Sequence, residues 1–179
     1  MFPFRSTQPL PDAGNSAVRS ALCIAVAALL CLCAGVAHAG SFEDAVAAKD
    51  RGDFAQALQR FKPLAQQGDA ASQFQLSLLY RNGQGVPANA TESLRWLRRS
   101  AHGGHAAAQS NLGAAYAQGR MLPQNTGLAY VWLSAGANGG SREAATNLTV
   151  LQRRMTPAEI SQARELASAC AQRHFQGCD

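Results

Sequence analysis

The chain repeats itself with a period of 36 residues. Residues 69–104 align with residues 105–140 without a gap, and 13 of the 36 aligned positions carry identical residues. About three identities would arise by chance at this composition, so the period indicates a repeated structural unit. Five identical positions define that unit, filled by Tyr80, Gly83, Pro87, Trp96 and Gly104 in the first copy and by Tyr116, Gly119, Pro123, Trp132 and Gly140 in the second.

Each copy is predicted to form a hairpin of two helices. Apolar residues recur at helical spacing before Gly83 and again after Pro87. Glycine readily takes the left-handed conformation that ends a helix, and proline cannot continue one, so these two residues mark the turn. Asn89 is expected to cap the second helix, with Glu92 completing a capping box, and Gly104 is expected to stop it.

The hairpins are expected to stack, because a single hairpin cannot cover its own apolar face. The divergent segments 42–68 and 141–173 keep apolar residues in the same register and are expected to form terminal units. In the second of them, Thr156 should cap a last helix that runs to Arg173. The predicted fold is all-α: over residues 40–179, an α-solenoid of about three antiparallel hairpins with a capping C-terminal helix.

The repeat resembles the Sel1-like repeat family, a relative of the tetratricopeptide solenoids. The family's unit reads A-x-A-Q-x-x-L-G-x-x-Y-x-x-G-x-G-V-P, then an acidic or amide residue, then A-x-x-W-x-x-x-A-A-x-x-G. Both copies match it at its glutamine, first leucine, tyrosine, proline and tryptophan positions and at most of its alanine and glycine positions. They depart from it at Ser77, Ser93, Met121 and Leu122. The resemblance implies an adaptor or scaffold that binds other proteins.

Residues 1–39 have the layout of a secretory signal peptide. Two arginines precede an apolar stretch over 21–35, and Ala37-His38-Ala39 is a small-x-small cleavage site before Gly40. The apolar stretch is shorter than the ~20 residues of a membrane-spanning helix, so we expect removal of the segment and no stable membrane insertion. A retained anchor is the alternative. The expected location of the mature chain is the periplasm, or the medium beyond it.

The charge pattern does not favour a nucleic-acid partner. The net charge is +5, which is mildly basic. Nucleic-acid-binding surfaces usually concentrate Lys and Arg on one face, often with interleaved aromatic side chains. The densest basic run here is Arg95, Arg98 and Arg99, on one predicted helix. We interpret it as a solvated helix face, and binding of an anionic glycan is the alternative.

Three of the five cysteines lie in segment 1–39. Cys170 and Cys178 remain in the mature chain, where an oxidising compartment favours a disulfide between them. In one unbroken helix their Cα atoms would be about 12 Å apart, so the bridge requires the chain to turn back near Gln176–Gly177. The alternatives are a metal site that includes His174, an intermolecular bridge, or free thiols.

The sequence predicts no enzyme, no cofactor and no metal site. It contains no P-loop, no G-x-S-x-G elbow, no dinucleotide-binding fingerprint and no other nucleophile-and-base set. His102 and His105 form an H-x-x-H pair without obvious further ligands nearby. We therefore interpret these two histidines as part of a surface turn.

The expected function is that of an exported module that binds a protein or peptide through the concave face of the solenoid. Polar positions on the first helices are the candidate partner-binding residues, namely Gln75, Arg81, Asn111 and Gln118. The alternative is an envelope hydrolase or penicillin-binding protein, because some cysteine-rich relatives carry C-x7-C pairs like Cys170–Cys178. Those relatives have a pair in each repeat, whereas these repeats have none.

Overall fold

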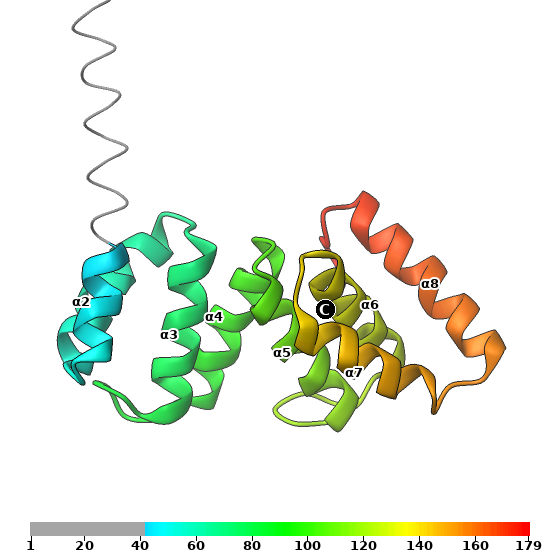
Figure 1. The fold of residues 1–179 in the computed structure, drawn as a ribbon, viewed down its shortest axis with the longest axis horizontal. Coiled ribbons are helices and arrows are strands. Elements are labelled where there is room, and N and C mark those ends of the chain that lie inside the picture. The colour runs from blue at the N-terminus through cyan, green and yellow to red at the C-terminus, as the bar shows by residue number, and fades with distance from the viewer. Residues whose placement is uncertain (1–41) are drawn as a thin grey trace, which may run out of the picture. The chain divides into compact units, whose positions relative to one another are not determined.

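The computed structural model describes residues 42–179, and the predicted signal peptide lies outside the described residues. Every regular element within 42–179 is helical, as the all-α prediction requires. Figure 1 shows short helices that follow one another in a row, joined by tight turns. A helical segment over 42–50 is followed by α2 (Phe54–Gln66), α3 (Ala70–Asn82), α4 (Ala90–His102), α5 (Ala106–Gln118), α6 (Thr126–Asn138), α7 (Arg142–Gln152) and α8 (Pro157–Gln172).

Each labelled helix begins with a side-chain cap, which satisfies one of the backbone N–H groups that a helix start leaves unpaired. The caps of α2 to α8 are Asp53, Asp69, Asn89, His105, Asn125, Ser141 and Thr156. Thr156 and Glu159 form a complete capping box. The capping box expected at Asn89 is only half formed. The Asn89 side chain accepts from Glu92 N–H, but the Glu92 side chain does not bond back to the Asn89 backbone. The carboxylate of Glu92 pairs with Arg95 at 2.6 Å, because a guanidinium is a stronger partner than a neutral N–H.

The helices pack largely on their neighbours in the chain. α3 lies against α4 and α5 against α6, as expected for the two repeated hairpins, while α2 contacts α3 and α7 contacts α6. The C-terminal helix differs from a regular stack, because α8 packs on α6 and makes few contacts with α7. Cys170 of α8 is buried against Val131 of α6. The terminal segment 141–173 is therefore not a closed hairpin.

A buried glutamine ties each repeat to the helix that precedes it. Gln73 donates from Nε2 to Ala65 O at the end of α2, at 3.0 Å, and Gln109 donates to Ala101 O at the end of α4, at 3.1 Å. Because a buried side-chain amide needs a hydrogen-bond partner, these bonds fix how the units stack. Ala145 occupies the same position in α7, so this bond is not repeated in the last unit.

The two tryptophans occupy equivalent places in two successive clusters of the core. Trp96 packs in a cluster with Phe61 and Leu76, and Trp132 packs in the next cluster with Leu112. The two indole side chains are 3% and 0% exposed. Leu97, beside Trp96 on α4, belongs to the second cluster, so α4 links the two. The core therefore runs along the row of helices, as in stacked repeats.

Candidate interaction groove

Two open grooves lie next to each other over the first helices of the repeats. One has a volume of about 240 Å³ and is lined by residues of α3, α4 and α5. The other has a volume of about 120 Å³ and is lined by residues of α5, α6 and α7. Ala114 and Gln118 of α5 line both. Together they form one continuous surface, which we call the first-helix groove.

The base of the larger groove contains two serines where the repeat pattern has smaller residues. Ser93 donates from Oγ to Ser77 O at 2.8 Å, which bridges α4 and α3. In the second repeat the position of Ser77 is taken by Gly113, where a Cβ would lie 2.7 Å from Leu133 Cγ. The glycine lets α5 and α6 approach more closely than a serine allows. The larger groove thus lies beside the hairpin in which serines, rather than a glycine and an alanine, stand between the two helices.

Two exposed apolar side chains stand at the edges of the first-helix groove. Met121 is 45% exposed and lines the larger groove, and Val150 is 48% exposed and lines the smaller one. Met121 also has a φ of 63°, in the left-handed region that non-glycine residues avoid. Gly85 has this conformation in the first repeat, with a φ of 72°. The second repeat thus keeps the loop shape but adds a thioether side chain at the groove.

Three arginines line the groove near the C-terminal ends of successive first helices. Arg81 belongs to α3, Arg120 follows α5, and Arg154 follows α7. All three side chains are exposed, and none forms an ion pair within residues 42–179. No carboxylate lines either groove, and the sequence has no acidic residue between Glu92 and Glu143. The groove is therefore positively charged along its whole length.

Three of the four candidate partner-binding residues, Arg81, Asn111 and Gln118, line the larger groove together. Gln75 does not line it, because its side-chain oxygen accepts a hydrogen bond from Lys49 Nζ at 3.2 Å. Lys49 lies on the N-terminal helical segment, so this contact holds Gln75 toward the preceding unit.

The sequence reasoning also missed other residues of the groove, among them Arg120, Met121, Asn147, Val150 and Arg154. Asn147 was detectable, because it stands 36 residues after Asn111, just as Asn111 stands 36 residues after Gln75. The others lie in loops or at helix ends, where the repeat pattern does not predict which side chains face a common surface.

Two of the three arginines on α4 cover an indole ring. The guanidinium carbons of Arg95 and Arg99 lie 4.3 Å and 5.1 Å from the ring centroid of Trp96, within cation–π range. The hydrogen-bonded pair with Arg95 lowers the pKa of Glu92 and raises that of Arg95, so both groups stay charged. An anionic ligand at this site would have to displace contacts that the chain already makes.

His102 and His105 lie at the two ends of the turn between α4 and α5, where the sequence places them, but both are half-buried and make specific contacts. His105 accepts from Ala108 N–H through Nδ1 at 3.3 Å and stacks on Phe74 at a centroid distance of 4.7 Å. His102 meets the Trp132 ring edge-on at 5.1 Å. Burial lowers the pKa of His105 from its ordinary value.

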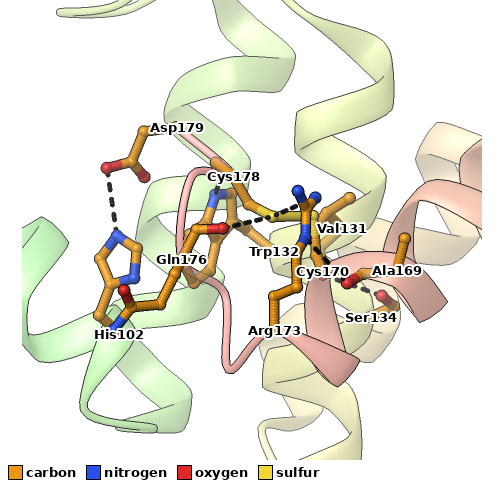
Figure 2. The surroundings of a disulfide bond; sticks show 10 residues. All are labelled: His102, Val131, Trp132, Ser134, Ala169, Cys170, Arg173, Gln176, Cys178 and Asp179. Carbon is orange, nitrogen blue, oxygen red and sulfur yellow. Dashed lines mark hydrogen bonds and ion pairs between the residues drawn. A yellow bond between two sulfur atoms is a disulfide. The ribbon is translucent and has the colours of Figure 1, made fainter.

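A disulfide between Cys170 and Cys178 joins the C-terminal segment to α8, with a Cα–Cα distance of 6.0 Å (Figure 2). The reversal covers residues 173–177, so it includes the expected Gln176–Gly177 and begins a few residues before them. α8 ends at Gln172, and His174 and Phe175 have φ values of 50° and 61°. These left-handed residues reverse the chain within a few positions, which brings the two sulfur atoms together. Both thiols are in the bridge, which leaves none for the alternative metal site.

The closed segment covers Trp132. The indole donates from Nε1 to Cys178 O at 3.2 Å, and the Phe175 ring stacks on it at a centroid distance of 5.1 Å. Figure 2 shows this segment beside His102, whose Nε2 lies 3.1 Å from the Asp179 carboxylate. Arg98 Nε lies 3.9 Å from the same carboxylate. The C-terminal segment thus covers the tryptophan of the second repeat, whereas arginines of its own helix cover Trp96 in the first.

Residues 42–179 contain no cluster of three histidine, cysteine, aspartate or glutamate side chains that could hold a metal ion. No helix described here has both the length and the apolar character needed to cross a bilayer.

Comparison with known proteins identifies the repeats. The family model of the Sel1 repeat matches residues 70–105 and 106–141. A solved Sel1 repeat protein from Oxalobacter formigenes is 32% identical with a TM-score of 0.53, and the match covers 66% of this chain and 96% of that one. The chain belongs to the Sel1 repeat family. The family's repeats begin one residue later than the boundaries that we set at 69 and 105, since those boundaries included each helix cap.

A second solved structure shares the fold. The protein c5321, described as a protective antigen present in uropathogenic Escherichia coli strains and displaying an SLR fold, has a TM-score of 0.69 and 21% identity. The match covers 79% of this chain but only 31% of that chain. At this identity the likeness establishes the α-solenoid fold alone, which confirms the fold prediction. The comparison with curated proteins gives no match.

Proposed function

We propose that this Sel1 repeat chain is an exported, non-enzymatic interaction module that binds a segment of a partner protein in the first-helix groove. Sel1 repeats are typically protein–protein interaction modules, and the family membership supports that class of function. The observation that carries the proposal is the convergence of Arg81, Asn111 and Gln118 on one open groove. Each of these side chains offers hydrogen bonds to a ligand without being needed by the core.

The groove suits an extended peptide better than a small molecule. It is lined by residues of five successive helices, α3 to α7, and its lining includes Ala114, Ala115 and Ala117 between polar side chains. Asn111 and Asn147 stand at the same register on α5 and α7, and neither amide bonds to another described side chain. An amide can donate to a peptide carbonyl and accept from a peptide N–H, so a repeated amide matches a repeated backbone.

In-cell photo-crosslinking tests this proposal. A photoreactive amino acid is placed at Asn111 or Gln118 within the groove, and at Leu166 on α8 as the control, because Leu166 is exposed but lines neither groove. We expect the same partner to be captured from the two groove positions and not from the control. Equal capture from all three positions, or capture from Leu166 alone, would contradict binding in the groove.

Export is a separate part of the proposal. It is supported by the signal-like segment 1–39 and by two cysteines that form a bridge in residues 42–179. Amino-terminal sequencing of the protein recovered from a periplasmic extract should begin at Gly40. A chain that starts with the uncleaved segment, or that stays in the cytoplasm, would contradict export.

The two alternatives have weaker support. The hydrolase hypothesis depended on the C-x7-C spacing of Cys170 and Cys178. In this chain their single disulfide holds the C-terminal segment over Trp132, which accounts for the spacing without a catalytic role. The glycan hypothesis depended on Arg95, Arg98 and Arg99. The guanidinium groups of these arginines already contact Trp96 or approach Asp179, so they are less open to a ligand. The first-helix groove has no comparable internal partners.

A further inference from the structure

We propose that the first-helix groove selects an acidic, extended peptide segment, with carboxylates that pair with Arg81, Arg120 and Arg154 in turn. This inference rests on the proposed function, because it names the kind of segment that the same groove binds. It is carried by two observations: the open placement of the arginines and the absence of carboxylates around them.

The arginines are placed for a ligand rather than for the fold. A cation at a helix C-terminus can stabilise the helix by bonding the last carbonyls. The guanidinium groups of Arg120 and Arg154 donate no hydrogen bond to any described group, and that of Arg81 reaches only the side chain of Asn82, at 3.5 Å. Their guanidinium groups are therefore open to a partner, unlike those of Arg95 and Arg99.

The surroundings of these arginines are free of competing carboxylates. None of the groove-lining residues is acidic, and the whole stretch between Glu92 and Glu143 contains no aspartate or glutamate. Elsewhere in residues 42–179, acidic residues are common at helix starts, as at Asp53 and Asp69. A guanidinium without a nearby carboxylate attracts an anionic ligand more strongly, and it repels basic segments.

The spacing of the arginines fits an extended backbone. α5 packs directly on α7, and packed helices lie about 8–10 Å apart, whereas α3 and α5 are joined through α4, which packs on both. An extended chain advances about 3.3 Å per residue, so about three residues span the distance from α5 to α7. Carboxylates about three residues apart would then reach Arg120 and Arg154, and the residues between them would contact Met121 and Val150.

Fluorescence anisotropy with three labelled peptides tests this selectivity. The probes are four repeats of Ser-Leu-Glu, of Ser-Leu-Gln and of Ser-Leu-Lys, each with the mature chain. We expect the Glu peptide to bind about tenfold more tightly than the Gln peptide, and the Lys peptide not to bind. Raising the ionic strength from about 0.02 M to about 0.3 M should remove most of that preference.

Charge-matched variants separate the groove from net charge. The variant R81Q/R120Q/R154Q should lose the preference for Glu over Gln. The control R51Q/R60Q/R142Q removes the same number of charges from exposed positions outside the groove and should keep it. Melting curves of both variants show that each remains folded. Equal loss in both variants would mean that only net charge matters and would overturn the proposal.

The remaining outcomes distinguish this inference from the proposed function. If Glu and Gln peptides bind equally and both are lost in N111A/Q118A, the groove binds peptides but has no acidic preference. If no probe binds, mass spectrometry of the crosslinked partner decides, because the captured segment must carry an excess of Asp and Glu. A neutral or basic segment overturns the acidic preference alone. Binding of duplex DNA or anionic vesicles through the three arginines, without peptide binding, would overturn both proposals.

Discussion

Asp69 and His105 occupy the same position in the 36-residue repeat, and each accepts a hydrogen bond from the start of a helix. The carboxylate of Asp69 accepts at 2.6 Å, whereas the imidazole of His105 accepts through Nδ1 at 3.3 Å. An imidazole can accept only while it is neutral, so the second repeat has a cap that depends on pH. The same register thus gives the two copies different responses to acid.

The cap at His105 predicts a loss of stability in mild acid. Burial lowers the pKa of His105 in the folded state below its ordinary value of 6.5, and the nearby Asp69 opposes this only in part. The unfolded chain therefore binds more protons, so this contribution to stability is full above 6.5 and declines as the pH falls below it. The loss should be at most about 1 kcal/mol, the usual strength of a cap.

Urea unfolding at neutral and at mildly acidic pH measures this effect. The variant His105→Asn keeps an acceptor at the cap but does not titrate, so it should lose less stability than the native chain on acidification. His174→Asn is the matched control, because His174 is exposed and caps no helix. Identical pH dependence in the native chain and in His105→Asn would contradict the role of the cap.

Met121 is the residue at which stability and binding should oppose each other. Its φ of 63° costs a non-glycine residue about 1 kcal/mol, and Gly85 avoids that cost at the same register. Met121→Gly should therefore raise the free energy of unfolding by up to about 1 kcal/mol. It should also weaken binding of a groove ligand, because the exposed thioether is lost. A variant that is less stable, or that binds as well as the native chain, would contradict this prediction.

At the scale of the elements, the distance between paired helices is set by single small residues. α5 and α6 meet at Gly113, where a Cβ would lie 2.8 Å from the backbone nitrogen of Leu133. At the equivalent place α3 carries Ser77, and a serine hydroxyl on α4 donates to its carbonyl. Close approach in one hairpin and a hydrogen-bonded spacing in the other explain why the larger groove lies beside the first hairpin.

Gly113→Ala should destabilise the chain by about 1–3 kcal/mol, because backbone atoms of α6 cannot move away from the added methyl group. Gly127→Ala is the matched control. Its added Cβ would meet only side-chain atoms at 3.4 Å, so the higher helix propensity of alanine should raise stability by roughly 0.5–1 kcal/mol. Thermal melting of both variants measures the contrast, and equal effects at the two positions would refute it.

At the scale of the whole molecule, the described chain is a row of helices whose two largest core clusters meet at α4. Each unit depends on its neighbour for burial, so the ends of such a row need special treatment. Here one end is finished by α8, which packs on α6, and by the disulfide-closed segment over Trp132. The bridge thus acts on the core of the second repeat and not only on the tail.

Opening the bridge should therefore uncover Trp132. Closing a loop of this length stabilises a chain by about 2–3 kcal/mol in the chain-entropy model, so Cys170→Ser/Cys178→Ser should lower the free energy of unfolding by that amount. In a Trp96→Phe background, where Trp132 is the remaining tryptophan, its emission should shift to longer wavelength as the indole gains contact with water.

The control for this experiment uses the other indole. In a Trp132→Phe background, Trp96 reports on the first cluster, and opening the bridge should leave its emission unchanged, because Arg95 and Arg99 cover it instead. If reduction leaves the Trp132 emission and its quenching by acrylamide unaltered, the tail does not shield the ring.

Local chemistry explains what could be predicted from the sequence. Helix starts at Asn89 and Thr156 and helix ends at Gly83 and Gly119 follow from single side chains that cap or break a helix. The 36-residue identity then indicated stacked hairpins and the Sel1 repeat family, because stacking demands the same residues at the same contacts. Such rules act within a few residues of the chain and need no knowledge of the rest.

Only the tertiary structure decided which side chains share a surface. The docking of α8 on α6, the cover over Trp132 and the alignment of Arg81, Arg120 and Arg154 each join residues from separate units. These depend on how closely two helices approach, which small differences such as Ser77 against Gly113 control. The repeat pattern is nearly the same in both copies, so it cannot encode where the groove is wide, where it is charged, or what closes its end.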